Sequence, residues 1–264
     1  MMYSDRAQYG VELWSQVLPL EPLQQLHQAA QACFVRVEET IAAVGAAAAA
    51  QHLPASYRFN PYSTNVHVDA LDEFLTEQTP ALNLLLNLLQ STPDLSKHCQ
   101  AWGGYSQGLR SQLRLRKQYA PGHGHALHRP NQWHQDGGLR VQFPPTADAE
   151  PYCTTPLTPL LTGWLPLTPC GYHAPGLEFV RVPQTQLLHY SKLDNATIHH
   201  LFDAVDFWQP VLTPGDLLWF DRGTLHRTAV NAEMSCDRLS LEWRLFKPDQ
   251  IPPAFQDEVW FSWL

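Results

Sequence analysis

The chain has 264 residues, 44% of them hydrophobic and 11% aromatic, and it carries 17 Lys and Arg against 25 Asp and Glu for a net charge of −8. This length and composition are typical of one large globular domain and exclude an intrinsically disordered chain. The negative balance argues against a nucleic-acid partner, because its field repels phosphates. The sequence shows neither a long apolar run that would span a membrane nor an N-terminal leader pattern, so we expect a cytoplasmic protein with no membrane partner.

Helices are predicted in the first part of the chain. Apolar residues recur at steps of three and four between Leu23 and Ile41, which predicts an amphipathic helix, and the alanine run at 46–50 is expected to extend it. Thr79 and Pro80 fit the N-cap and the first position of a second, leucine-rich helix.

Strands are predicted from Leu109 onward, where the apolar spacing changes to every second residue. Helices followed by short strands, without βαβ alternation or a Gly-rich phosphate loop, predict a mainly β protein, a double-stranded β-helix (jelly-roll, cupin-like) barrel with N-terminal helices packed on it. We expect one domain, with helical support over 1–105, the barrel over 106–247 and a C-terminal tail over 248–264. Further strands are expected at 160–167, 177–182, 207–212, 217–220, 225–230 and 238–246.

A metal site is predicted from the spacing of histidine and aspartate. The five cysteines are never spaced as CxxC and predict reduced packing residues, whereas thirteen histidines point towards metal or acid–base chemistry. His134 and Asp136 stand two residues apart, so their side chains project to one side of an extended segment. His226, which follows a turn, an apolar run and a second turn, is the third predicted ligand. Two histidines and one carboxylate suit Fe(II), because they leave the opposite face of the metal open for a co-substrate and O₂.

Polar side chains are expected on the inside of the barrel. Thr228 lies two residues after His226, and Ser240 lies two residues after Arg238. Each pair therefore points to one side of its strand. An arginine in such an interior suits the distal carboxylate of a co-substrate, since its planar guanidinium binds carboxylates in a bidentate manner with hydroxyl groups assisting.

With these residues in place, the chain resembles the phytanoyl-CoA dioxygenase family, which includes the ectoine hydroxylases. The resemblance covers about residues 109–246 and implies Fe(II), 2-oxoglutarate as co-substrate and O₂. It also implies hydroxylation, or another oxidation, of an unactivated C–H bond in a small-molecule substrate, with release of succinate and CO₂. The matching stretches are 133–136, 163–167, 175–180, 215–228 and 237–246.

The resemblance also implies roles for individual residues. Arg238 corresponds to the arginine that binds the distal carboxylate of 2-oxoglutarate, Thr228 to a nearby hydroxyl residue and Trp164 to an aromatic beside the co-substrate. Ser240 completes an Arg-x-Ser pattern, and Gln135, between two of the ligands, is also expected to contact the co-substrate.

Two departures from the family pattern, and one further pair of arginines, leave alternatives open. Arg238 lies somewhat far beyond His226, which makes Arg244 the substitute for carboxylate binding. The segment 142–159 resembles an insertion and is a candidate lid over the active site. Arg114 and Arg116 share one strand face. The alternatives for this face are contact with an acidic substrate, contact with the co-substrate, and exposure to solvent.

Other polar patterns have simpler interpretations. A second His-x-Asp, at His67 and Asp69, is read as structural, with Asp69 capping a helix. The histidines of the Gly-bearing loop at 121–128 are read as a polar loop that is still eligible to contact substrate. Because position 136 is Asp rather than Ala or Gly, we do not expect the protein to catalyse halogenation.

Two other functions use the same residues. A cupin-like zinc or manganese isomerase or hydrolase without 2-oxoglutarate would share the three metal ligands, but it would have no need for Arg238 on the barrel wall. A catalytically silent binding protein would be expected to have lost a ligand, and here His134, Asp136 and His226 are all present.

Overall fold

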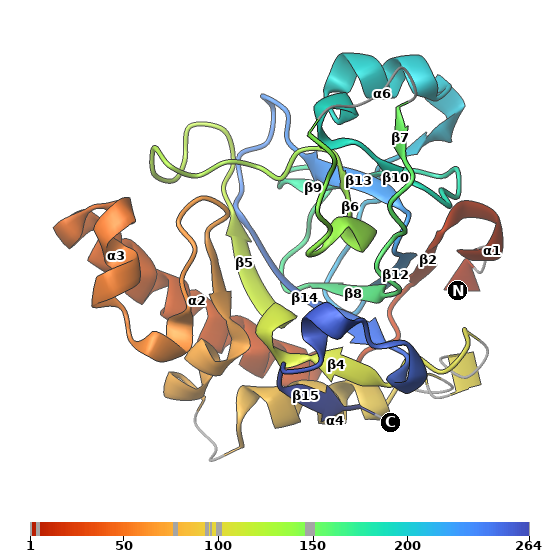
Figure 1. Cartoon of the computed structure of the whole chain (residues 1–264). Coiled ribbons are helices and arrows are strands. Elements are labelled where there is room, and N and C mark those ends of the chain that lie inside the picture. The colour runs from red at the N-terminus through yellow and green to blue at the C-terminus, as the bar shows by residue number, and fades with distance from the viewer. Residues whose placement is uncertain are drawn as a thin grey trace.

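The structure is a computed structural model of the whole chain, and two antiparallel sheets with helices packed outside them dominate it (Figure 1). No helix among the described residues is both long and apolar enough to cross a membrane. The described residues are 2–3, 6–75, 79–92, 95, 97–98, 102–145 and 151–263, with side chains from residue 8 onward.

The larger sheet runs in the order β1-β2-β12-β8-β14-β4-β15, and β5 continues it on the same side of β14 as β4, with β3 beyond β5. Every pairing in it is antiparallel. Its strands are β1 (Met2–Tyr3), β2 (Val11–Trp14), β3 (Asn65–His67), β4 (Gln107–Leu109), β5 (Arg114–Gln118), β8 (Leu161–Pro166), β12 (Leu217–Asp221), β14 (Arg238–Phe246) and β15 (Trp260–Ser262).

The smaller sheet runs β11-β9-β13-β6 and is also antiparallel, and β7 pairs with β10 beside it. These strands are β6 (His134–Gln135), β7 (Tyr152–Cys153), β9 (Gly176–Val180), β10 (Leu187–Leu188), β11 (Phe207–Trp208) and β13 (Leu225–Ala229). The two sheets form the predicted jelly-roll barrel, so the expected fold class is confirmed.

The helices lie mainly on the outer face of the larger sheet (Figure 1). The α-helices are α1 (Arg6–Tyr9), α2 (Leu20–Val44), α3 (Ala46–His52), α4 (Ala81–Gln90) and α6 (Asn195–Leu201). Short 3₁₀ helices are η1 (Ala55–Tyr57), η2 (Val68–Glu73), η3 (Arg110–Gln112), η4 (Asp136–Gly138), η5 (Tyr190–Lys192), η6 (Ala204–Asp206), η7 (Pro248–Gln250) and η8 (Pro253–Phe255).

Side chains alternate between two cores along each strand of the larger sheet. Leu239, Leu241 and Trp243 of β14 point outward and pack with the apolar faces of α2 and α4. Trp164 of β8 and Phe220 of β12 point inward and pack with the smaller sheet. Polar side chains of β5 and β14 share this inner side, and the predicted polar barrel interior is therefore present.

Two predictions for the first helices are wrong. The alanine run does not extend the first helix, because Gly45 has φ +83° and separates α2 from α3. Thr79 and Pro80 do not supply an N-cap and a first helical residue. Pro80 is itself the N-cap, without a side-chain bond, and Asp72 accepts the amide hydrogen of Ala81 at 2.6 Å instead.

The second His-x-Asp is structural, but its roles differ from those expected. The side chain of His67, rather than Asp69, caps η2 by accepting the amide hydrogen of Asp69 at 3.2 Å. Asp69 pairs with Arg110 at 3.0 Å. These contacts tie β3 to η3 beside β5.

Several strands differ from their predicted extent. The strand that starts near Leu109 is interrupted by η3, and the strand expected at 207–212 ends at Trp208. The strand expected at 238–246 has those bounds. Strands β2, β3 and β15 join the larger sheet from outside 106–247. The sequence did not predict them, because such short segments carry too few residues to show a period of two.

Candidate metal centre and active site

The structure brings the three predicted metal ligands together. His134 lies on β6, Asp136 begins η4 directly after it, and His226 lies opposite His134 in the pairing of β13 with β6. One ligand atom from each residue lies within 4.8 Å of the others. This spacing suits three ligands on one face of a single metal ion.

Backbone carbonyls fix the tautomers of both histidines. Nδ1 of His134 lies 2.7 Å from the carbonyl oxygen of Gln132, and Nδ1 of His226 lies 3.0 Å from that of Thr224. Because a carbonyl oxygen only accepts, both Nδ1 atoms carry the hydrogen, which leaves each Nε2 lone pair free to bind a metal. Burial lowers the pKa of His226 to about 3, so that this imidazole is neutral near neutral pH.

Each oxygen of Asp136 has its own hydrogen-bond donor. Oδ1 accepts from Nη2 of Arg244 at 3.0 Å, and Oδ2 accepts from the hydroxyl of Thr162 at 2.5 Å. Burial alone would raise the pKa of this carboxyl, but the Arg244 guanidinium outweighs it and holds the pKa of Asp136 well below its usual range. The carboxylate is therefore ionised and held in one orientation.

The two histidine ligands share one cavity with the predicted carboxylate-binding arginine. Arg238, from the larger sheet, and the two histidines, from the smaller sheet, line the same space. Thr228 and Trp164 also line it, as the resemblance implied. The complete lining consists of Arg116, Asn131, His134, Trp164, Leu177, Phe220, His226, Thr228, Arg238 and Glu242.

Arg238 is a buried cation that forms no ion pair with a carboxylate of the described residues. Only 1% of it is exposed, Nη1 donates to the carbonyl oxygens of Pro175 and Gly176 at 3.2 and 3.0 Å, and the guanidinium lies 5.2 Å from the ring centre of Trp164. Its Nε has no hydrogen-bond partner among the residues that the structure describes. Burial lowers the pKa of Arg238 to about 10, and it is still protonated near neutral pH.

Two more unpartnered polar groups lie next to Arg238. Ser240 is fully buried, and its hydroxyl has no partner in the described part of the chain. Nη1 of Arg116, opposite Ser240 on β5, is buried and unpartnered as well. Buried polar groups are normally hydrogen-bonded, so this group of donors is suited to a bound anion.

Arg244 and Glu242 carry an ion-pair chain along the barrel interior. Besides binding Asp136, Arg244 lies 3.6 Å from Glu242, which accepts a hydrogen bond from Arg116 at 3.1 Å. Burial opposes the charge of Glu242, yet Arg116 and Arg244 lower its pKa to about 2. Arg244 is thus engaged with a metal ligand, which favours Arg238 over Arg244 for carboxylate binding.

Gln135 lies on the opposite side of β6 from its two neighbours. Its amide donates to the carbonyl oxygens of Gln186 and Gly223, both at 3.0 Å, and accepts from the amide of Leu188 at 2.7 Å. These bonds fix β6 against surrounding loops. The geometry does not support the expected contact of Gln135 with a co-substrate.

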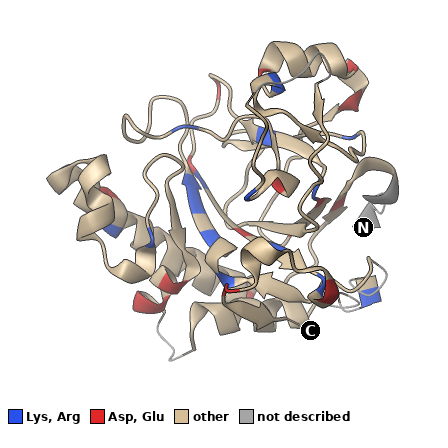
Figure 2. Cartoon of the chain, in the orientation of Figure 1, with Lys and Arg blue, Asp and Glu red and all other residues tan. Residues whose placement is uncertain are grey.

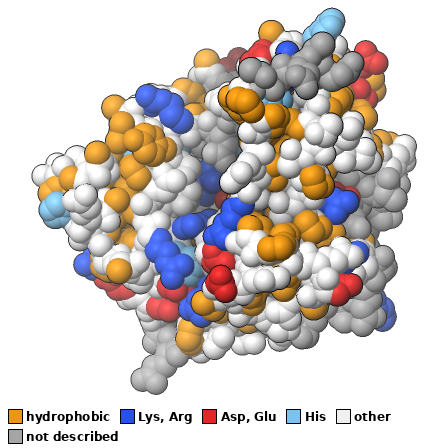
Figure 3. Space-filling model, in the orientation of Figure 1, with side chains coloured by type: hydrophobic (Ala, Val, Ile, Leu, Met, Phe, Trp, Pro, Cys, Tyr) orange, Lys and Arg blue, Asp and Glu red, His pale blue; other side chains and the backbone are white. Residues whose placement is uncertain are grey.

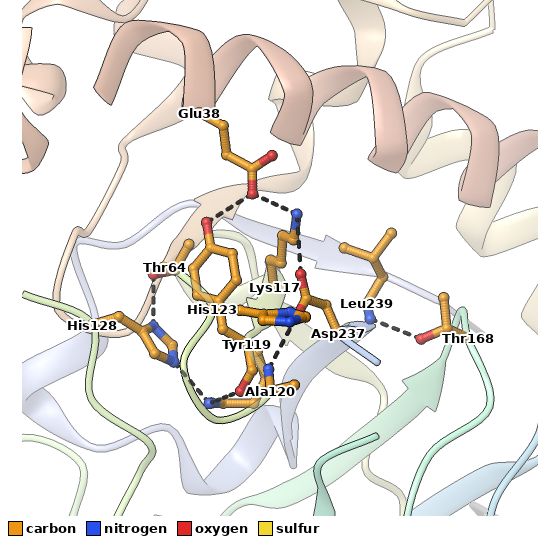
Figure 4. Close-up of polar contacts among 11 residues, drawn as sticks. Glu38, Thr64, Lys117, Tyr119, Ala120, His123, His128, Thr168, Asp237 and Leu239 are labelled. Atoms are coloured by element: carbon orange, nitrogen blue, oxygen red, sulfur yellow. Dashed lines mark hydrogen bonds and ion pairs between the residues drawn. The ribbon is translucent and has the colours of Figure 1, made fainter. Parts of the chain in front are cut away.

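The histidine-bearing loop at 121–128 supplies none of the three metal ligands, and its histidines make other polar contacts (Figure 4). His123 lies 2.9 Å from Asp237, and His128 lies 2.7 Å from the hydroxyl of Thr64. Nearby, Lys117 bridges Glu38 of α2, at 2.5 Å, and Asp237, at 3.5 Å. The loop thus takes part in the polar contacts where α2 meets the edge of the barrel.

The insertion at 142–159 is described only in part, since 146–150 lie outside the described residues. After that gap, β7 pairs with β10, and Thr158 binds the backbone of Gly137 and Leu139 next to the ligand Asp136. The lid prediction for the whole segment is not tested by these contacts.

Sequence reasoning missed two residues of the site. Thr162 lies one residue before the matched stretch 163–167, and only its position opposite Arg244 across two strands reveals its role. Glu242 lies in the matched stretch 237–246, but the strand pattern alone does not show which arginines surround it.

Comparisons with known proteins agree with this fold. No protein-family model matches the sequence, and no curated protein matches it significantly. Among solved structures, EctD from S. alaskensis with bound Fe aligns at TM-score 0.60 and 15% identity over 93% of this chain and 75% of its own. The epimerase SnoN, in complex with Fe3+, alpha ketoglutarate and nogalamycin RO, aligns at 0.55 and 15% over 96% and 87%. AviO1 from Streptomyces viridochromogenes Tue57 aligns at 0.55 and 16% over 94% and 97%.

Proposed function

We propose that this protein is an Fe(II)- and 2-oxoglutarate-dependent oxygenase that oxidises a C–H bond of a small molecule. The observation that carries the proposal is a single cavity in which His134 and His226 face a buried arginine that has no carboxylate partner in the described structure. A buried unpaired cation is costly, and a dianion that reaches from the metal to this arginine would remove that cost.

The residues present fit both groups. Nε2 of His134, Nε2 of His226 and Oδ1 of Asp136 form a two-histidine, one-carboxylate set, which suits Fe(II). The free donors on Arg238 and Ser240 fit the distal carboxylate of 2-oxoglutarate. Bound together, iron, 2-oxoglutarate and O₂ supply an oxidant for unactivated C–H bonds and yield succinate and CO₂.

The chain's own residues position the reactants. Thr162 donates to Oδ2 of Asp136 and Arg244 to Oδ1, and Oδ1 is the oxygen that lies 3.9 Å from Nε2 of His134. A metal held through Oδ1 alone would keep a further coordination position open. His134 retains 32% side-chain exposure, and substrate would approach from this side of the cavity. Phe220 and Leu177 give the cavity an apolar wall and limit the access of water.

Hydroxylation is the outcome we propose first, and desaturation, epimerisation or ring formation are further outcomes on this fold. Solved structures with the same fold include the epimerase SnoN and the carbocyclase SnoK, the latter at TM-score 0.52 and 14% identity. A cupin-like isomerase or hydrolase without 2-oxoglutarate is disfavoured, because Arg238 would then stay buried and unpaired.

The test is succinate formation from 2-oxoglutarate by protein loaded anaerobically with Fe(II) and then exposed to O₂. Slow turnover without added substrate is expected, and His226→Ala should abolish it. Arg238→Ala should recover turnover only at much higher 2-oxoglutarate. Arg36→Ala is a matched control, because Arg36 pairs with Glu73 on the exposed side of α2. A protein that binds iron but not 2-oxoglutarate would refute the proposal.

A further inference from the structure

We propose that the substrate carries an oxyanion, a carboxylate or a phosphate, and that Arg114 binds it. This inference rests on the proposed function and concerns the part of the barrel interior next to the same cavity, where Arg114 lies opposite the lining residue Glu242. It starts from the charge inside the barrel, which is opposite in sign to the net charge of the chain.

Lys and Arg residues gather along β5 (Figure 2), which pairs with β14. The register places Arg114 opposite Glu242 and Arg116 opposite Ser240, so all of these side chains point to the inner side with Arg238. Among the described residues there, four guanidinium groups, those of Arg114, Arg116, Arg238 and Arg244, face the two carboxylates of Glu242 and Asp136. The charges of Fe(II) and 2-oxoglutarate cancel, so the excess of positive charge persists after both bind.

Of these four arginines, Arg114 is the one with neither a carboxylate partner among the described residues nor a place in the cavity lining. Arg244 binds Asp136 and lies near Glu242, Arg116 binds Glu242, and Arg238 faces the cavity. The side chain of Arg114 makes no hydrogen bond and no ion pair with any residue in the described ranges, although it is half-buried.

The surroundings of Arg114 are cationic. Burial lowers the pKa of Arg114, and of the neighbouring charges Glu242 raises it while Arg58, Arg244 and Arg116 lower it further. An arginine that simply pointed into solvent would not be held half-buried among three other guanidinium groups. An anion between Arg114 and Arg58 would relieve this repulsion.

Arg58 extends the cationic surface to the rim. It is exposed, has φ +44°, and makes no hydrogen bond or ion pair within the described part of the chain. Figure 3 shows Lys and Arg side chains gathered around a hollow between the helical part and the barrel. Because Arg58 is exposed and Arg114 half-buried, an anionic group arriving from solvent would meet Arg58 first and Arg114 further in.

The experiment measures anion binding to the protein loaded anaerobically with Fe(II) and 2-oxoglutarate. The probes are benzoate and inorganic phosphate, with benzamide as the neutral match for benzoate, titrated by calorimetry. Wild type should bind at least one anion saturably and more tightly than benzamide. Arg114→Gln should weaken that binding roughly tenfold, Arg114→Lys should weaken it less, and Arg36→Gln should not alter it.

Binding of 2-oxoglutarate is measured first on every variant, so a failure of the proposed function is seen separately. Arg114→Gln should bind 2-oxoglutarate as wild type does, and circular dichroism should show an unchanged fold. The inference is overturned if benzamide binds as tightly as both anions, if Arg114→Gln leaves anion binding unaltered, or if it weakens 2-oxoglutarate instead. A preference for phosphate over benzoate would identify the substrate's acidic group as a phosphate, and the reverse as a carboxylate.

Discussion

Arg244 of β14 donates a hydrogen bond from Nη2 to Oδ1 of Asp136 at 3.0 Å, across the interior of the barrel from one sheet to the first turn after β6. Oδ1 is also the Asp136 oxygen that lies 3.9 Å from Nε2 of His134. Arg244 therefore acts on the oxygen that faces the other metal ligands and fixes where it points.

Replacing Arg244 should weaken metal binding. Arg244→Met keeps the length of the side chain but removes the hydrogen bond to Asp136, and we expect the affinity for Fe(II) to fall roughly 10- to 100-fold. Anaerobic titration with Fe(II) measures this directly. Arg244→Lys, which keeps the charge, should lie between Met and wild type, and equal affinities in all three proteins would contradict the role.

Removing the hydroxyl of Ser240 should affect the co-substrate and not the fold. Because this buried hydroxyl has no described partner, Ser240→Ala should leave the free energy of unfolding unchanged or slightly raised. The same variant should raise the KM for 2-oxoglutarate several-fold, since a carboxylate would lose one donor. Urea unfolding and succinate assays check the two effects, and a large loss of stability with an unchanged KM would show that Ser240 is structural only.

Much of this site could be predicted because its residues lie on short, regular segments. A strand with a period of two places His134 and Asp136, or Arg238 and Ser240, on one side whatever the rest of the chain does. A jelly roll with helices outside also follows from the order of the two patterns.

The remainder depends on contacts that local patterns do not encode. Two contacts of Asp136 arise from the register of β8 against β14. Thr162 donates a hydrogen bond to Asp136, and Arg244 binds Asp136 rather than the co-substrate. The break at Gly45 was hidden because alanines on both sides favour helix strongly. Gln135 was misjudged because a residue between two ligands on a strand faces away from them.

Gly163 is predicted to be indispensable for the packing of β8. A Cβ atom at this position would lie 2.3 to 2.5 Å from the indole ring of Trp243 on the neighbouring strand β14. Gly163→Ala should therefore lower the free energy of unfolding by about 1–3 kcal/mol through overpacking. Denaturant unfolding measures the loss, and Trp243→Phe in the same chain should recover part of it. If the single variant matched wild type, the close approach would be disproved.

The last prediction concerns the pH dependence of stability and the half-buried ring of His128. Its Nε2 lies 2.7 Å from Nε2 of Gln118, which can only donate, and its Nδ1 lies 2.7 Å from the hydroxyl of Thr64. This arrangement suits a neutral ring with its hydrogen on Nδ1. Burial, with a smaller contribution from His125, lowers the pKa of His128 from 6.5 to about 4.

Because the unfolded chain takes up this proton at a higher pH than the folded chain, the contribution of His128 to stability is complete above about pH 6.5. It is lost as the pH falls from there to about 4, and it is constant below that value. We expect His128→Gln, which does not titrate, to show a shallower fall in unfolding free energy than wild type over this range. Urea unfolding at a series of pH values measures both slopes. Equal slopes for His128→Gln and wild type would refute the prediction.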